Sequence, residues 1–423
     1  MILGAPVLAL EQLNDEQRLA VDMVKRGENI MITGPAGTGK SVILRYLESI
    51  LPEFHITAFT GIAALNVGGC TIHSWAGLGK GDDPASVIAE RHLKNRNYKW
   101  YCICRAKALA IDETSMLDAD GFDLLDQVLR MVRQTDRPFG GLQLILFGDF
   151  LQLAPVAKDK PLRFAFESRA WAEAKIKVVY LKRVMRQNNQ EFAEILNQAR
   201  TNSLTEASKA VLRTRINAVD PDPSILPVRL VTHNADADLI NVQEMLKLPE
   251  PERTWTASDW AENRFAEAAI DRDCIAPRQV SLRVGAQVML LRNLSVDSGL
   301  VNGSIGVVTD LGSPETGPVV DFGNGVAQEI ETAKWETKRF GEVVASRSQI
   351  PLRAAYAISI HKSQGMTLDK IEVSLRRCFA DGQAYVALSR ARTLEGLFIK
   401  DISGRSIQAN PRALEFYRKH AVN

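Results

Sequence analysis

The sequence predicts an α/β protein built on parallel sheets, and three observations support this fold class. Short apolar runs at 30–33, 56–59, 108–111 and 142–147 each end in polar residues. Amphipathic stretches of helical length, such as 118–134, lie between the runs. A glycine-rich turn follows the first run, where a strand would give way to a helix. This alternation is typical of a parallel sheet, whose ligands bind beyond the carboxyl ends of its strands, so the four polar tips should face one site.

The first apolar run leads into the stretch TGPAGTGKS at residues 33–41. Gly34, Gly39, Lys40 and Ser41 fit the pattern G-x-x-x-x-G-K-[ST]. The glycines let successive N–H groups point at phosphate oxygens, the lysine reaches the β- and γ-phosphates, and the hydroxyl ligates Mg²⁺. A helix that begins near Lys40 adds its positive N-terminal end. The alternative is a glycine-rich turn without a ligand, but the strand before it and the helix after it favour a nucleoside triphosphate site.

The third and fourth apolar runs end in residues suited to hydrolysis. Asp112 and Glu113 follow the run 108–111: the aspartate would hold Mg²⁺ through its hydration shell, and the glutamate would orient and deprotonate the attacking water. The alternative is an acidic helix start with Asp112 as the N-cap. Gln152 lies in GDFLQLAP after the fourth run, where an amide can touch the γ-phosphate or position water, although loop glutamines are usually solvated.

Three further residues are weaker candidates on spacing alone. Gln17, in LNDEQ, could pair both polar atoms of its amide with an adenine edge, but Asn14 and Gln17 also have the spacing of a capping box. Both roles can hold at once. Arg186 and Arg390 could stabilise charge on a transferring phosphoryl group, although most arginines in basic stretches are solvated at the surface.

A second series of α/β elements begins near residue 183. The run 228–231 ends in Thr232-His233-Asn234, and the run 354–360 ends in His361-Lys362-Ser363. Between them, residues 285–350 read as short strands separated by glycine turns, which predicts a small β-barrel insertion.

Composition restricts the class of protein without naming it. The 423 residues are 46% hydrophobic and 24% charged, as in soluble globular proteins, and no run is long enough to span a bilayer. The formal net charge is only +2, so any nucleic-acid site must be a local stripe rather than a global basic field. Five cysteines without paired zinc spacing are simplest to interpret as reduced thiols.

The stretch RHLKNRNYKWYCICRAK at 91–107 mixes basic and aromatic residues. Six Lys and Arg side chains alternate with Tyr98, Trp100 and Tyr101. Rings that stack on bases beside cations suit nucleic acid. The alternative is a solvated helix face with aromatics packed beneath it, and the sequence does not choose between the two.

The full set of motifs resembles superfamily-one DNA helicases of the Pif type (petite integration frequency), relatives of RecD and Dda. The resemblance extends from residue 13 to residue 392. It rests on LNDEQ, GPAGTGKS, TGIAALNVGGCTIHSWAG, IDETSMLDADGFDLLD, PFGGLQLILFGDFLQLAPV, LKRVMRQ, VMLLRNLSVDSGLVNGSIGVV, AISIHKSQGMTLD and GQAYVALSRAR. The stretch 116–142 is the most specific, because it looks like this family's own signature region. Ala154 and Met185 depart from the family pattern, and neither change removes a charge or a metal ligand.

The resemblance implies two RecA-like P-loop motor domains with parallel sheets, at 1–182 and 183–423. The first would carry a small wedge insertion at about 77–107 and the second a β-barrel insertion at about 285–353. ATP would lie between the domains, and single-stranded DNA would cross both. The ATP and Mg²⁺ site would comprise Gln17, Gly37, Thr38, Gly39, Lys40, Ser41, Asp112, Glu113, Gln152, Gly365 and the two arginine fingers Arg186 and Arg390. The DNA channel would comprise Thr60, Gly61, His73, Thr232, His233, Asn234, His361, Lys362 and Ser363.

The predicted function is therefore an ATP-dependent DNA helicase that steps 5′ to 3′ and unwinds duplex or structured DNA such as forks or G-quadruplexes. It would act in replication, repair, recombination or telomere maintenance. The rival enzyme class is an ATP-driven remodeller of RNA or protein–DNA complexes, and the rival binding class is a DNA clamp that uses ATP as a switch. We expect a monomer without a membrane partner. We expect a cytoplasmic protein of a bacterium or phage, or a nuclear or mitochondrial one if the chain is a trimmed eukaryotic core.

Overall fold

The computed structural model divides the chain into two compact units, which we describe one at a time. It describes residues 9–79, 81–155, 161–184, 190–295, 298–313, 316–323, 327–339, 342–403 and 406–422. The first unit comprises 1–203, 380–383 and 408–423, and the second comprises 204–379 and 384–407. The units therefore differ from the predicted domains 1–182 and 183–423, because the helix after residue 189 and the C-terminal segment both pack with the first unit.

The first unit contains a seven-stranded sheet in the order β21-β6-β1-β5-β4-β2-β3, and every pairing in it is parallel. Successive side chains of a strand point to opposite faces, and the core follows this alternation. In β1, Met31 packs into the cluster on one face, and Ile30 and Ile32 pack into the cluster on the other. The strands are β1 (Ile30–Thr33), β2 (Phe54–Ala58), β3 (Cys70–Thr71), β4 (Ala108–Asp112), β5 (Gln143–Phe147), β6 (Lys177–Tyr180) and β21 (Ala421–Val422).

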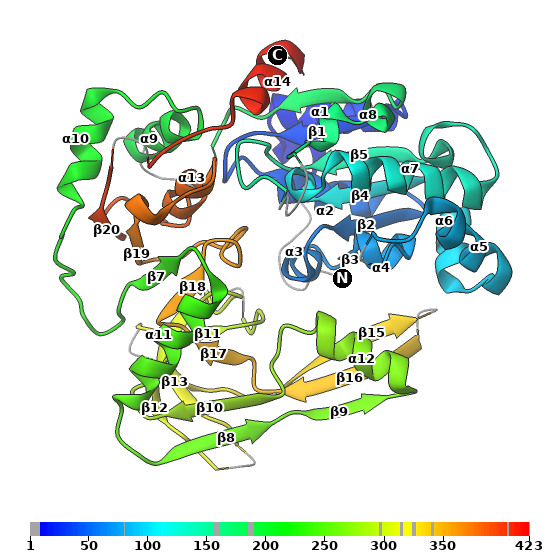
Figure 1. The fold of residues 1–423 in the computed structure, drawn as a ribbon. Coiled ribbons are helices and arrows are strands. Elements are labelled where there is room, and N and C mark those ends of the chain that lie inside the picture. Colours follow the sequence, from blue (N-terminus) through cyan, green and yellow to red (C-terminus); the bar gives the residue numbers. More distant parts are fainter. Residues whose placement is uncertain are drawn as a thin grey trace. The chain divides into compact units, whose positions relative to one another are not determined.

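Helices cover both faces of this sheet (Figure 1), as the predicted α/β fold requires. One face packs against α1 (Asp15–Lys25), α2 (Lys40–Ile50) and α3 (Gly61–Asn66). The other face packs against α4 (Ile72–Ala76), α5 (Ala85–Asn95), α6 (Tyr98–Arg105), α7 (Ala119–Arg133), α8 (Arg169–Glu173) and α14 (Pro411–His420). A further helix, α9 (Gln190–Arg200), completes the unit.

The predicted insertion at 77–107 forms the helices α5 and α6, whose apolar residues join the core next to α7. Arg133, near the end of α7, holds the end of α6 in place. Its guanidinium donates to the carbonyls of Ile103, Cys104 and Ala106 at 2.5, 3.2 and 3.0 Å, and to that of Gly140 at 2.7 Å. The signature stretch 116–142 therefore anchors the insertion to the sheet.

The second unit contains a four-stranded parallel sheet in the order β18-β7-β19-β20. Asn241 on α11 stabilises its edge: the amide accepts from the N–H groups of Tyr356 and Ala357 and donates to the Ala357 carbonyl. The strands are β7 (Val228–Val231), β18 (Ala357–Ser359), β19 (Ile371–Ser374) and β20 (Leu397–Asp401). The helices of the unit are α10 (Glu206–Thr214), α11 (Asn234–Leu246), α12 (Arg264–Asp273) and α13 (Gln383–Leu388).

The predicted β-barrel region consists of antiparallel strands that begin at Glu252, earlier than the predicted residue 285. The five-stranded sheet β14-β13-β12-β11-β17 and the pair β10-β8 share one apolar core, and β15-β16-β9 form a third sheet. The strands are β8 (Glu252–Thr256), β9 (Ser258–Ala261), β10 (Gln279–Arg283), β11 (Gln287–Leu290), β12 (Ile305–Asp310), β13 (Val319–Asp321), β14 (Ala327–Glu329), β15 (Ala333–Arg339), β16 (Glu342–Gln349) and β17 (Leu352–Ala354).

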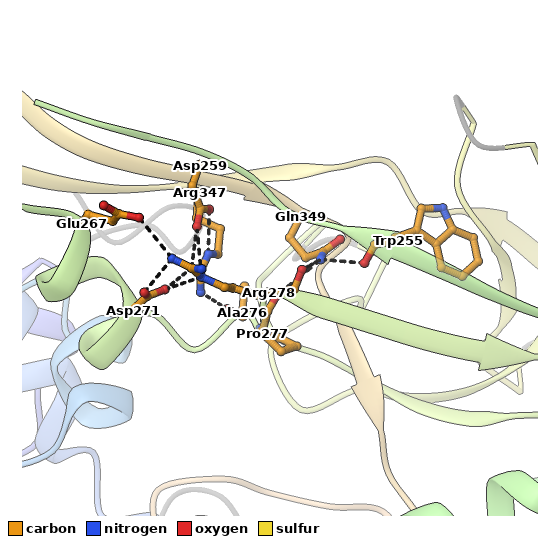
Figure 2. A network of polar contacts seen from close by, with 9 residues as sticks. All are labelled: Trp255, Asp259, Glu267, Asp271, Ala276, Pro277, Arg278, Arg347 and Gln349. Atoms are coloured by element: carbon orange, nitrogen blue, oxygen red, sulfur yellow. Dashed lines mark hydrogen bonds and ion pairs between the residues drawn. The ribbon is translucent and has the colours of Figure 1, made fainter. Parts of the chain in front are cut away.

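A buried arginine joins the third of these sheets to α12 (Figure 2). Arg347 on β16 is 2% exposed and binds Asp259 of β9 with two hydrogen bonds of 2.8 and 2.6 Å, and Asp271 of α12 with one of 2.6 Å. Arg278 adds a second pairing to Asp271. The hydrogen bonds that Arg347 donates to Asp259 raise the pKa of Arg347, so the guanidinium stays charged. None of the helices in the described ranges combines the length and apolar character needed to cross a bilayer.

Candidate active site and nucleic-acid surface

The predicted phosphate loop connects β1 to α2, as the motif requires. Gly37 and Gly39 have positive φ of 81° and 86°, and Gly39 is the N-cap of α2. A side chain is disfavoured at such angles, so the loop depends on glycine there. The Thr38 hydroxyl donates to the Pro35 carbonyl at 3.0 Å and stabilises the turn, while Ser41 lies exposed in the first turn of α2. N–H groups at the N-terminus of a helix attract anions, so this turn suits a phosphate.

Gln17 has the capping role that its spacing predicts and also supports the phosphate loop. Its N–H donates to the Asn14 side chain at 2.9 Å, and its side-chain oxygen accepts from the Asn14 N–H at 3.1 Å. Its amide nitrogen donates to the Thr38 carbonyl at 3.2 Å. An amide offers two donor hydrogens and two lone pairs, and these two side-chain contacts use one of each.

Lys40 lies against the loop that it belongs to. Its ammonium donates to the Gly34 and Pro35 carbonyls at 2.7 and 2.9 Å. Burial lowers the pKa of Lys40, and the carboxylates of Asp149, Glu113 and Asp112 oppose that shift. Two of these carboxylates, Asp112 and Glu113, are the ones that the sequence assigned to hydrolysis.

Asp112 and Glu113 lie at the carboxyl end of β4, two strands from β1 in the sheet. Asp112 accepts a hydrogen bond from the Glu113 N–H at 2.9 Å, and Glu113 rather than Asp112 is the cap of the short helix that follows. Burial, followed by the charge of Glu113, raises the pKa of Asp112 to about 7. A nearby cation would favour its ionised form.

The donor set at this edge fits Mg²⁺, because the Ser41 hydroxyl and the Asp112 carboxylate are hard oxygen ligands. Within the described ranges, no group of three or more His, Cys, Asp or Glu side chains gathers to hold a metal. A bound Mg²⁺ would therefore take its remaining ligands from phosphate and water, as magnesium in nucleotide sites does.

Gln152 follows β5, between β1 and β4 in the sheet order, and is 7% exposed. It belongs to a tight turn in which its N–H donates to the Asp149 carbonyl at 2.9 Å and the Leu151 N–H donates to the Asp149 carboxylate at 3.1 Å. The backbone of Gly382 approaches so closely that a Cβ there would overlap the Gln152 carbonyl. These contacts fix the backbone of the turn, and with it the backbone position of Gln152.

The two predicted arginine fingers fare differently. Arg186 lies outside the described residues. Arg390 is 2% exposed and donates to the carbonyls of Val386, Ser363 and Met366 at 2.8, 3.3 and 2.8 Å. In the second unit it ties the turn that carries Gly365 to the helix α13. In this structure the Arg390 guanidinium is therefore engaged with backbone carbonyls of its own unit.

The DNA candidates of the first unit follow β2 and β3. The Thr60 hydroxyl accepts from the Ala63 N–H at 3.2 Å and caps α3, which begins at Gly61. His73 on α4 is half-buried, with its ring edge on Phe59 at 5.2 Å between centroids. Burial lowers the pKa of His73, so the imidazole is mostly neutral near pH 7.

The DNA candidates of the second unit gather at the carboxyl ends of the neighbouring strands β7 and β18. Thr232, His233 and Asn234 follow β7, and His361 and Lys362 follow β18. The Asn234 side chain accepts from the Ser359 hydroxyl at 2.6 Å and links the two tips. Burial and the neighbouring His233 lower the pKa of His361. Ser363 is fully buried and donates to the Ile360 carbonyl at 2.8 Å, so its hydroxyl shapes the turn rather than facing solvent.

The sequence reasoning missed Phe379, which stacks on His233 with ring centroids 5.7 Å apart at an interplanar angle of 19°. Phe379 is 69% exposed, which is unusual for a phenylalanine. It also missed Arg200 and Tyr417, which bind the Asp149 carboxylate from α9 and α14. The signal for Phe379 was a large aromatic residue in the short stretch RRCFADG at 376–382, which also holds two arginines and an aspartate. The sequence carried no comparable signal for Arg200 or Tyr417.

The basic and aromatic stretch at 91–107 has features of both interpretations that the sequence allowed, a nucleic-acid surface and a solvated helix face with aromatics packed beneath it. The Lys and Arg residues are exposed, and Trp100 is half-buried with Arg96 over its ring at 5.7 Å. Tyr101 is 45% exposed and accepts a hydrogen bond from Arg105 at 2.6 Å. Arg96, Trp100 and Arg137 line an open cavity of about 350 Å³.

Comparisons with known proteins identify the family. Residues 12–220 match the PIF1-like helicase family, and residues 265–311 match the family of the DNA helicase Pif1 2B domain. The crystal structure of Pif1 helicase from Candida albicans is 32% identical, with a TM-score of 0.79 over 96% of this chain and 99% of that chain. This chain belongs to the Pif1-like helicase family.

Further relatives show how far the likeness extends. The ATP-dependent DNA helicase PIF1 of Danio rerio is 42% identical over 98% of this chain and 65% of its own length, and that of Homo sapiens is 42% identical over 96% and 63%. The chain thus spans just under two thirds of these curated relatives. The Bacteroides sp Pif1 complex with ADP-AlF4 is 31% identical, with a TM-score of 0.82 over 96% of both chains. Bacteroides Pif1 bound to ssDNA is 31% identical, with a TM-score of 0.68 over 96% of both.

Proposed function

We propose that this chain is an ATP-dependent DNA helicase that moves 5′ to 3′ along single-stranded DNA and separates the strands of duplex or structured DNA. One observation carries the proposal: Lys40, Asp112, Glu113 and Gln152 lie at or after the carboxyl ends of three neighbouring strands of one parallel sheet, in a chain of the Pif1-like family. The names of the PIF1 relatives, and Bacteroides Pif1 structures with ADP-AlF4 and with ssDNA, support ATP and DNA as substrates.

In the proposed reaction, the Lys40 ammonium leaves the Gly34 and Pro35 carbonyls and pairs with the β- and γ-phosphates. The N–H groups of the phosphate loop bind the same oxygens, and the remaining polar atoms of Gln17 bind the adenine edge. Glu113 takes a proton from the attacking water, which Gln152 orients toward the γ-phosphorus. The water oxygen bonds to that phosphorus as its bond to the β–γ bridging oxygen breaks, which releases phosphate and ADP. Mg²⁺ held by Ser41 and Asp112 would neutralise charge on the phosphates.

Arg186 and Arg390 are the proposed arginine fingers that stabilise charge on the transferring phosphoryl group. For Arg390 this role requires the guanidinium to exchange a carbonyl of the 363–366 turn for a phosphate oxygen. That exchange would connect the nucleotide state to the turn that carries Gly365 and follows His361 and Lys362. Such a link between a γ-phosphate and a binding loop is how nucleotide switches work.

The proposed DNA surface uses polar groups for the backbone and rings for the bases. In the first unit it comprises Thr60, Gly61 and His73. In the second it comprises Thr232, His233, Asn234, His361 and Lys362, with Phe379 as an added stacking platform. Ser363 would act through the shape of its turn. Phosphate contacts with sequence-tolerant stacking suit a protein that moves along a strand. The helices at 85–105 are the proposed wedge at the duplex.

A remodeller or translocase that works on RNA or protein–DNA complexes is the second candidate, because the same ATP chemistry serves it. Comparing the stimulation of ATP turnover by single-stranded DNA and by RNA separates the two. Stimulation by RNA alone would favour the remodeller.

The deciding experiment is strand separation on two partial duplexes that differ only in a 5′ or a 3′ single-stranded tail, with ATP and Mg²⁺. We expect unwinding of the 5′-tailed substrate only. Lys40→Ala is the control, because it removes the ammonium while single-strand binding persists. Unwinding of the 3′-tailed substrate alone would overturn the proposed polarity. Unwinding of neither, with DNA-stimulated ATP turnover intact, would overturn the helicase assignment in favour of a translocase.

A further inference from the structure

Tyr417, on the C-terminal helix α14, contacts two segments of the ATP site at once. Its hydroxyl lies 2.8 Å from the Thr33 hydroxyl, at the end of β1 directly before the phosphate loop. The same oxygen accepts from the Phe150 N–H at 2.8 Å, in the turn that carries Gln152, and lies 3.4 Å from the Asp149 carboxylate. A phenolic oxygen has one hydrogen and two lone pairs, so these three contacts satisfy it completely when Thr33 donates.

A buried ion pair holds the other side of the same turn. Arg200, at the end of α9, is 1% exposed and donates twice to the Asp149 carboxylate, at 2.7 and 2.8 Å. The guanidinium lies over the rings of Tyr180 and Tyr417 at 5.3 and 5.4 Å and donates to the Tyr180 hydroxyl at 2.6 Å. Burial alone would raise the pKa of Asp149, but the charge and hydrogen bonds of Arg200, the charge of Lys40 and the Leu151 N–H together lower it and keep the carboxylate ionised.

These contacts lie at the carboxyl ends of three neighbouring strands. Tyr180 ends β6, Thr33 ends β1, and Asp149 follows β5, in the sheet order β6-β1-β5. One phenolic oxygen therefore connects Thr33, directly before the phosphate loop, to the turn that carries Gln152. The ion pair of Arg200 and Asp149 supports the same turn. Neither Tyr417 nor Arg200 is a residue that the ATP motifs include.

We propose that Tyr417, supported by Arg200, is a positioning residue for ATP hydrolysis that fixes the Gln152 turn relative to the phosphate loop. The inference rests on the proposed role of Gln152. Tyr417 does not need to touch ATP. It acts through the two hydrogen bonds that join Thr33 to the Phe150 backbone, and a small misplacement of a water-orienting group is costly in rate.

Tyr417→Phe removes only the hydroxyl and keeps the ring in its packing. We expect the kcat of DNA-stimulated ATP turnover to fall about tenfold or more, while the KM for ATP changes much less, because the phosphate loop itself stays intact. Thr33→Val should give the same pattern. The double variant should be little slower than either single one, since both break the same contact.

Two comparisons, both made in the full chain, keep the test specific. Arg412→Gln removes the pairing of Arg412 with Glu167, at 2.9 Å, near the other end of α14, so it weakens the docking of that helix without touching the network. It should leave kcat unchanged. Gln152→Ala, measured in parallel, should slow turnover at least as much as Tyr417→Phe does.

The outcomes separate the inference from the function that it rests on. Normal kcat in Tyr417→Phe, with slow Gln152→Ala, would overturn the inference and leave the function standing. An equal loss of kcat in Arg412→Gln would also overturn the inference, because weaker docking of α14 would then explain the result for Tyr417→Phe. Normal kcat in Gln152→Ala would reject the proposed role of Gln152, and with it the route through the turn. The inference is supported if kcat falls in Tyr417→Phe but not in Arg412→Gln, and if the losses of Tyr417→Phe and Thr33→Val are not additive in the double variant.

Discussion

Glu113 adopts a left-handed backbone conformation, with φ of 53° and ψ of 40°, directly after β4. This conformation costs a non-glycine residue of order 1–3 kcal/mol and persists only where its surroundings impose it. Here the buried Thr114 hydroxyl donates to the Ile111 carbonyl at 2.8 Å. Gly148 leaves room beside the N–H groups of Thr114 and Ser115, because a Cβ there would lie only 3.0 and 3.2 Å from their nitrogens. These contacts hold Glu113 in its strained conformation directly after the strand.

Glu113→Gln should keep the fold and ATP binding but lose turnover by roughly 10²- to 10⁴-fold, because an amide cannot accept the proton of the attacking water. The measurement is phosphate release at saturating ATP and single-stranded DNA. Glu53→Gln is a matched control, because Glu53 also has a positive φ, of 52°. Glu53 lies just before the amino end of β2, whereas Glu113 lies just after the carboxyl end of the parallel strand β4. Turnover near the wild-type rate in Glu113→Gln would remove this residue from the role of base.

Phe379 should contribute to the grip on DNA through its exposed ring. Stacking of one base on an aromatic side chain contributes about 1–3 kcal/mol, so Phe379→Ala should weaken single-stranded DNA binding by at least several-fold. Phe379→Leu should weaken it nearly as much, because leucine has no π-face. Fluorescence anisotropy with a labelled oligonucleotide measures both. Trp260→Ala, at a 53% exposed aromatic on β9, is the control. Equal losses at Trp260 and Phe379 would contradict a specific platform.

At the scale of elements, Asp149 and Arg200 join the turn after β5 to α9 by a pair that is almost fully buried. Removing one partner of such a pair leaves an uncompensated charge and costs about 3–5 kcal/mol. Asp149→Ala should therefore lower the free energy of unfolding by that amount, as measured by denaturant unfolding. Glu206→Ala breaks an exposed pair with Lys209 and should lower the free energy of unfolding far less, because solvent screens that pair. An equally small loss of unfolding free energy in both variants would contradict the buried character of the pair of Asp149 and Arg200.

The elements that the sequence predicted are those with a local pattern. The run 30–33, the phosphate loop and the helix after it form one contiguous signal, and so do 108–111 with Asp112 and Glu113. The strand β21 has only two residues and pairs with β6 more than two hundred positions earlier, at Ala421↔Val178. No periodicity exists over two residues, and no local pattern reports a partner so far away. For this reason the sequence placed the C-terminal segment in the second domain, whereas residues 408–423 group with the first unit.

At the scale of the whole molecule, the chain leaves the first unit at 203 and returns to it at 380–383 and again at 408–423. The last return supplies α14, whose Phe416 stacks on Phe166 with centroids 4.3 Å apart and meets the edge of Phe150 at 5.5 Å. Arg412 and Tyr417 add polar contacts to the same unit. The first unit is therefore continuous in space but not in sequence (Figure 1).

A fragment of residues 1–203 should consequently fold poorly, because it exposes the aromatic cluster that Phe416 and Tyr417 cover. Deleting each ring from a core costs about 3–5 kcal/mol, which is a large part of the stability of a typical domain. Joining residues 406–423 to this fragment through a flexible linker should restore a cooperative thermal transition in circular dichroism. The same linked fragment with Phe416→Ala and Tyr417→Ala is the control and should not recover. Equal transitions in the bare and the linked fragments would mean that the first unit folds without its C-terminal return.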